Sequence, residues 1–259
     1  MQNNLLLTLR NLVYRTLSFF DKIFFRKTDI VILCYHAIDE RTRFSTSFTD
    51  FTKQIYKLEK THFAISLSEL VLKIKANKLE KDKKYFVVTF DDGYKSVLKV
   101  RKFLEIKGIK PTMSLIQDHK NVVNHESEKF LNQNDILHLI KSGWEFASHT
   151  KTHKKLSELN TKDLKVEIAR PSSRIKTITY PLGRYSTRVL KEIKREGYQI
   201  GLTMDDDFIN KSTNLLTLPR VGVDATHDLS IFESIYSPSV IAFRKLIKNS
   251  FMKNIFINI

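Results

Sequence analysis

Short apolar segments that favour β-strands alternate with amphipathic helical segments along most of this 259-residue chain. Such alternation with short joints is typical of a parallel sheet, open or closed into a barrel, with helices outside it. The fold class that we expect is therefore α/β. Functional side chains in these folds gather where strands end. Strands are predicted over 30–35, 85–90, 112–116, 144–147, 177–180 and 199–203, and helices over 49–60, 69–75, 95–107, 135–141, 161–169 and 187–195.

Two neighbouring carboxylates, Asp91 and Asp92, directly follow the predicted strand at 85–90. An Asp-Gly pair turns the backbone, so a plain turn is one interpretation. Two adjacent carboxylates repel each other, however, and a turn needs only one of them. A bound metal ion would relieve that repulsion. On this segment alone, a turn and a functional site stay equally open.

Two histidines, His149 and His153, follow the predicted strand at 144–147. A spacing of four places both rings on one side of a helical turn, where they can share a metal. A chance pair on an exposed helix is the alternative. One Asp and two His ligands would leave a coordination position open for water, as in catalytic zinc sites. The second aspartate would then serve as a base.

These two motifs resemble the first two motifs of the polysaccharide deacetylase family, carbohydrate esterase family 4. They are Thr-Phe-Asp-Asp-Gly at 89–93 and Ser-His-Thr-Lys-Thr-His at 148–153, and Tyr-Pro-Leu-Gly at 180–183 resembles the third. The resemblance spans roughly residues 30–223. It implies a distorted (β/α) barrel and metal-dependent removal of N-acetyl groups from sugars.

The resemblance also assigns roles to individual residues. It makes Asp91 the catalytic base and Asp92, His149 and His153 the ligands of zinc or of another divalent metal such as Co, Ni or Mn. A backbone amide near Leu182 would stabilise the oxyanion.

Two departures from the family pattern leave roles to be filled. Where many members carry an arginine that orients the base, this chain has Thr179, and Arg220 is the expected substitute. The late histidine that many members use as general acid has only His227 as a candidate. His36, at the end of the first strand, instead resembles the acid of the permuted branch, which includes deacetylases of poly-N-acetylglucosamine. We therefore predict His36 as the acid, with a buried structural histidine as the alternative.

Two tyrosines, Tyr94 and Tyr185, flank the first and third motifs. Aromatic side chains at such places either line a sugar site or pack in the core. The sequence leaves both possibilities open.

Residues 1–28 form a separate basic amphipathic segment ahead of a catalytic domain at 29–259. Leu and Phe residues recur at near-helical spacing among four cations: Arg10, Arg15, Lys22 and Arg26. The arginines interrupt any spanning segment, and the pattern differs from a secretory signal. Such a helix lies on an anionic membrane surface or packs on the core. We predict peripheral attachment to the inner face of a bacterial cytoplasmic membrane, with the catalytic domain in the cytoplasm.

The charge of the chain is strongly positive, with 44 Lys and Arg against 28 Asp and Glu and a net charge of +16. This excess favours an anionic partner, although a lysine-rich solvated surface has the same signature. Without a recognition element, nucleic-acid binding is not predicted. Cys34 is the single cysteine, so no internal disulfide can form. A hydrolase of non-sugar amides is the nearer rival to a deacetylase, and an inactive basic glycan- or membrane-binding module is the more distant one.

Overall fold

The structure, a computed structural model, describes residues 2–24, 27–119, 129–250 and 252–256. Its strands are β1 (Ile30–Tyr35), β2 (Ala37–Ile38), β3 (Ser45–Thr46), β4 (Phe63–Ala64), β5 (Tyr85–Phe90), β6 (Thr112–Leu115), β7 (Glu145–Ser148), β8 (Thr177–Thr179), β9 (Ile200–Leu202) and β10 (Val221–Gly222). Its helices are α1 (Gln2–Ile23), α2 (Phe48–Glu59), α3 (Leu67–Lys75), α4 (Leu98–Ile106), α5 (Gln133–Lys141), α6 (Thr161–Ile168), α7 (Thr187–Glu196), α8 (Leu229–Ile235), α9 (Pro238–Ile247) and α10 (Lys253–Phe256).

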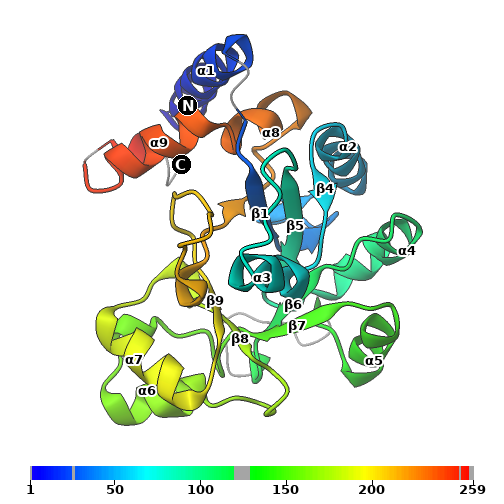
Figure 1. The fold of residues 1–259 in the computed structure, drawn as a ribbon, viewed down its shortest axis with the longest axis vertical. Coiled ribbons are helices and arrows are strands. Elements are labelled where there is room, and N and C mark those ends of the chain that lie inside the picture. Colours follow the sequence, from blue (N-terminus) through cyan, green and yellow to red (C-terminus); the bar gives the residue numbers. More distant parts are fainter. Residues whose placement is uncertain (1, 25–26, 120–128, 251, 257–259) are drawn as a thin grey trace.

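The main sheet is parallel and curls into a distorted barrel, which confirms the predicted fold. Its strands run in the order β10-β1-β5-β6-β7-β8-β9, and β4 pairs with β5. The segment at 218–222 joins the two edges, because Leu218 bridges to Leu202 of β9 while β10 pairs with β1. Helices surround the strands, with α6 and α7 beside β8 and β9 and with α4 and α5 beside β6 and β7 (Figure 1).

The parallel register brings the carboxyl ends of β1, β5 and β7 to one edge of the barrel. Tyr35, the last residue of β1, pairs with Phe90, the last of β5. Ser148, the last residue of β7, pairs with Leu115 of the intervening strand β6. All residues of β1 and β5 are buried, so the packed strands hold the chain that follows them in place.

Several boundaries differ from the predicted ones for local reasons. The helix predicted from Glu69 begins at Leu67, because the side chain of Ser66 and not that of Ser68 accepts the N-terminal hydrogen bond, from the Glu69 amide. The Ser68 hydroxyl donates to Glu145 instead. The helix predicted at 95–107 starts as a 3₁₀ turn, Lys95–Val97. Helices α8, α9 and α10 follow the last predicted strand, in a region without a predicted element.

The N-terminal helix α1 packs against α8, α9 and α10 at one end of the molecule (Figure 1). Tyr14 is 2% exposed within the main core cluster, and its hydroxyl donates to the carbonyl of Phe256. The opposite side of α1 exposes an apolar stripe: Leu5, Leu9, Leu12, Phe19, Phe20 and Ile23. Of the two alternatives for the amphipathic helix, packing on the core is observed, and membrane binding through the exposed apolar face stays a prediction.

The cations predicted to accompany that face are mostly engaged elsewhere. Arg10 is buried, Arg15 donates to the hydroxyl of Ser230, and Lys22 forms an ion pair with Glu233 at 2.9 Å. Arg26 lies outside the described residues. No helix in the described part of the chain combines the length and the hydropathy needed to cross a bilayer.

Candidate active site

The three predicted metal ligands converge at the carboxyl edge of the barrel. One ligand atom each of Asp92, His149 and His153 lies within 4.8 Å of the others. Asp92 Oδ1 is 3.4 Å from His149 Nε2 and 3.8 Å from His153 Nε2. The two Nε2 atoms face each other at 3.1 Å. One carboxylate and two imidazole nitrogens form a donor set that suits zinc or a related divalent cation.

The orientation of His149 fits this role. Its Nδ1 lies 2.9 Å from the carbonyl oxygen of Thr179, a contact in which the ring must donate. That hydrogen bond directs Nε2 at the other two ligands, where it can bind a metal, as in known metal sites. Burial alone would lower the pKa of His149, but the nearby Asp91 and Asp92 carboxylates raise it. The negative charge of Asp91 and Asp92 therefore favours an additional positive charge, such as a metal ion, beside His149.

The backbone reaches this geometry through left-handed residues and not through the helical turn predicted from the spacing of four. Asp92, Thr150 and His153 have φ angles of 68°, 66° and 58°. The segment that carries both histidines is a loop after β7. The predicted proximity of the two rings is correct, but the predicted turn is wrong. Three non-glycine residues in this costly region within one site are typical of a functional constraint.

Asp91 forms a buried bidentate ion pair with Arg220. The Arg220 terminal nitrogens donate to its two oxygens at 2.8 and 2.7 Å, and the guanidinium also contacts Thr89 Oγ1 and the Thr203 carbonyl. Burial would raise the pKa of Asp91, but the positive charge of Arg220 outweighs it and holds that pKa well below its usual range. Asp91 is therefore ionised and fixed in orientation.

The barrel closure explains why Arg220 can take this position. It lies between Leu218, which bridges to β9, and β10, which pairs with β1. The Arg220 side chain is 2% exposed and reaches the end of β5 from within this closing segment. Thr179, at the position of the family arginine, is buried, and its hydroxyl contacts that of Ser114 at 2.7 Å.

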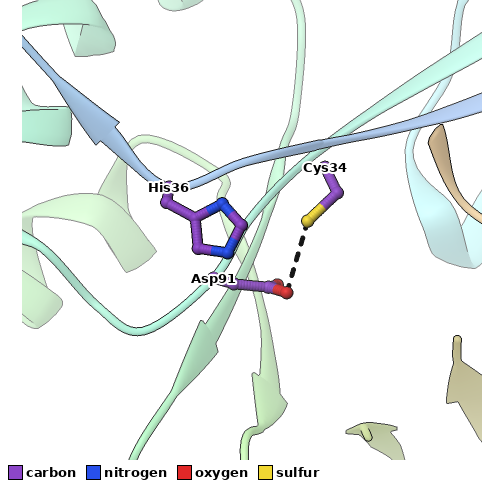
Figure 2. A group of neighbouring side chains, drawn as sticks. All are labelled: Cys34, His36 and Asp91. Carbon is purple, nitrogen blue, oxygen red and sulfur yellow. Dashed lines mark hydrogen bonds between the residues drawn. The ribbon is translucent and has the colours of Figure 1, made fainter. Parts of the chain in front are cut away.

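His36 and Cys34 lie beside Asp91 (Figure 2). Ligand atoms of the three residues lie within 4.8 Å of one another, and the Cys34 thiol donates to Asp91 Oδ2 at 3.3 Å. Arg220 already neutralises this carboxylate, and burial raises the pKa of the Cys34 thiol. The cluster is therefore a poor cation site, and we interpret it as a proton-handling group. Sequence reasoning missed Cys34, although it lies in β1 two residues before His36, a spacing that places both side chains on one face of an extended segment.

The competing histidine, His227, belongs to a separate cluster. Its Nδ1 is 3.4 Å from Asp224 Oδ1, and its ring lines a cavity on whose wall His36 also lies. Burial lowers the pKa of His227 to about 4 despite the Asp224 charge. A histidine that is neutral at pH 7 lacks the acidic imidazolium proton that a general acid donates.

The remaining candidates are Leu182, Tyr94 and Tyr185, and both tyrosines contact residues other than the three ligands. Leu182 has a left-handed φ of 55° in the 3₁₀ turn Pro181–Gly183 and is 56% exposed. Tyr94 stacks on Phe130 at a centroid distance of 5.1 Å. Tyr185 donates to Asp205 Oδ2 at 2.7 Å and lines another cavity. Their predicted substrate roles stay predictions.

Comparisons with known proteins agree with this geometry. Residues 78–201 match the family model for polysaccharide deacetylase. A protein of Bacillus subtilis strain 168, YxkH, whose name places it with the polysaccharide deacetylases, is 26% identical over 202 residues, which are 74% of this chain and 70% of YxkH.

Solved structures share the fold. The Streptococcus pyogenes deacetylase PplD, solved with acetate, superposes with a TM-score of 0.69 at 21% identity, over 81% of this chain and 98% of PplD. BC0361, a polysaccharide deacetylase from Bacillus cereus, gives a TM-score of 0.63 at 26% identity, over 82% of this chain and 70% of BC0361. Residues 78–201 therefore match the polysaccharide deacetylase family, and the chain shares its fold with solved deacetylases.

Proposed function

We propose that this protein is a metal-dependent hydrolase that removes N-acetyl groups from an N-acetylhexosamine-containing glycan or lipid-linked sugar. The observation that carries the proposal is the convergence of Asp92, His149 and His153 beside the Asp91–Arg220 pair. The family match over residues 78–201 supports an enzyme that acts on carbohydrate acetyl groups. The sugar and the metal dependence are our inference.

Each protein side chain has a distinct role in the proposed reaction. A divalent cation held by Asp92, His149 and His153 would polarise the acetamide carbonyl and acidify a water molecule. Asp91 accepts the proton of that water as its oxygen adds to the carbonyl carbon. Arg220 weakens Asp91 as a base while keeping it ionised, so the water must be acidified for the transfer to proceed.

His36 completes the hydrolysis. Its proton goes to the amide nitrogen as the C–N bond breaks, because an unprotonated amine is a poor leaving group. Acetate and a free amino sugar are released. The backbone amide near Leu182 is our proposed donor to the developing oxyanion.

Acetate release from N-acetylhexosamine oligomers and lipid-linked sugars, with and without Zn, Co, Ni or Mn, tests this function. We expect Asp91→Asn to abolish turnover and keep the metal, whereas His149→Ala loses both. His138→Ala, which removes an exposed histidine on α5, is the matched control and should behave as wild type. Full activity of Asp91→Asn would refute the assigned base. Turnover only of non-sugar amides would favour the rival hydrolase.

We also propose that the apolar stripe of α1, defined above, attaches the enzyme to an anionic membrane surface. The stripe is exposed while the other side of α1 is packed, and the chain carries a net charge of +16. Buried apolar area and attraction to anionic lipid both contribute to such binding. Because Lys22 is paired and Arg10 is buried, the apolar contribution should dominate. The side of the membrane stays a prediction.

Sedimentation with phosphatidylcholine vesicles, with and without phosphatidylglycerol, tests this attachment. Replacing Leu9 and Phe20 with Ser should abolish binding, whereas Leu72→Ser, at an exposed leucine of α3, should leave it intact. Equal binding of all three proteins would contradict the proposal. Dimerisation through the stripe, seen by gel filtration, would do so as well.

A further inference from the structure

A cavity beside the candidate acid is lined by arginines that the deacetylation chemistry does not use. It has a volume of about 200 Å³, and His36 forms part of its wall. Arg10 from α1, Arg43 from the loop before β3, and Arg244 from α9 also line it. The barrel, the N-terminal helix and a C-terminal helix thus contribute to one cavity.

Arg10 is a buried cation with neutral partners. Its side chain is 3% exposed, and its guanidinium donates to Asn11 Oδ1 and, at 3.1 Å, to Thr226 Oγ1. Among the described residues, no carboxylate lies within ion-pair distance of it. Burial lowers the pKa of Arg10 and outweighs the neighbouring Tyr14 and Asp224, which raise it. A buried charge without an ionic partner is costly unless a ligand compensates it.

The other groups of the cavity wall add to this excess of donors. Arg244 forms an ion pair with Asp206 at 2.8 Å, but its Nε is buried and has no hydrogen-bond partner within the described part of the protein. His36 Nδ1 is also buried and has no hydrogen-bond partner among the described residues. Arg43 lies half-exposed at 3.8 Å from Asp224. The guanidinium groups of Arg10, Arg43 and Arg244 therefore outnumber the two carboxylates beside them, Asp224 and Asp206.

We infer that this cavity binds an oxyanion group of the substrate, a phosphate or a carboxylate, next to the N-acetyl group that is removed. The inference rests on the proposed function, since it places the anionic group through the shared residue His36. Arginine is well suited to both groups, because its planar donors match two oxygens at once. It also gives α1 a part in substrate recognition.

Matched substrates test the inference. An N-acetylhexosamine oligomer is compared with one that carries a phosphate ester and one that carries a neighbouring uronic acid. We expect wild-type kcat/KM to be higher for one of the anionic oligomers than for the neutral one. Comparison of the phosphate ester with the uronic acid identifies which oxyanion is bound. Because hydrogen bonds to charged groups contribute most, Arg10→Gln should reduce the preference by roughly 10- to 100-fold. Arg43→Gln changes a half-exposed side chain, so it tests the same loss without a risk to folding. Arg15→Gln, five residues along α1 and outside the cavity, is the control and should keep the preference.

A binding measurement separates this inference from the proposed function. Calorimetric titration with inorganic phosphate should show binding that weakens in Arg10→Gln and Arg43→Gln but not in Arg15→Gln. If no substrate is hydrolysed and this pattern still appears, the anion site stands and the proposed function fails. An active enzyme with the same preference in all four proteins would overturn the inference. Phosphate binding that ignores Arg43→Gln would also overturn it, because the anion would then lie elsewhere, for instance at the metal.

Discussion

His36 and His227 line the same cavity, yet only His36 lies beside Asp91. His227 instead contacts Asp224, and its pKa of about 4 leaves it neutral at the pH of most assays. The position beside Asp91 favours His36 as the general acid, and the low pKa of His227 argues against that residue.

We predict that His36→Ala lowers kcat by roughly 10²- to 10⁴-fold, the usual contribution of a well-placed acid. Its metal content should equal that of wild type, because His36 is outside the ligand set. His227→Gln keeps a hydrogen-bonding side chain and should lower kcat far less. Steady-state kinetics with metal analysis of each variant decide the matter. A fully active His36→Ala beside an inactive His227→Gln would reverse the assignment.

At the scale of single residues, the sequence predicted the site residues that belong to short motifs. It missed the residues that distant segments of the chain bring to the site. Asp91, Asp92, His149 and His153 follow strands in recognisable strings, so their meeting was predictable. Arg220 was only a candidate, because no local sequence pattern indicates that its side chain reaches Asp91 from the segment at 218–222. Arg10 could not be predicted at all as a residue of the cavity wall, since its neighbours there come from the far end of the chain.

Helix α1 is an element whose two faces have different roles. Its inner face is part of the fold: Tyr14 is buried in the main core cluster, and Asp21 accepts hydrogen bonds from the amide and hydroxyl of Ser239. Its outer face carries the exposed apolar stripe. Amphipathic periodicity predicted such a helix but could not tell which side meets protein, because α8, α9 and α10 were not predicted.

We therefore expect Tyr14→Ala to lower the free energy of unfolding by roughly 3–5 kcal/mol, the usual cost of truncating a large buried aromatic side chain. Leu12→Ser, on the stripe, should change it by less than about 0.5 kcal/mol. Urea denaturation followed by circular dichroism measures both. Equal, small effects would show that α1 is only loosely attached to the domain.

The curl of the parallel barrel brings the ends of β1, β5 and β7 to one edge. Alternating strands and helices made this architecture predictable. Closure through residues 218–222 was not predictable, since β10 has only two residues and pairs with the first strand of the barrel. The site thus depends on contacts between segments almost 190 residues apart, such as Leu33 with Val221.

Metal binding should accordingly stabilise the whole molecule. Asp92 follows β5, whereas His149 and His153 follow β7, so one cation would link two parts of the barrel. A ligand at 100 times its Kd stabilises the folded state by about 2.7 kcal/mol, which for a chain of this size raises the Tm by several degrees. We expect zinc to produce this shift in wild type and His138→Ala, and EDTA to reverse it. His153→Ala should show a much smaller shift. Differential scanning calorimetry at increasing zinc concentrations provides the measurement, and an identical shift in His153→Ala would remove that residue from the ligand set.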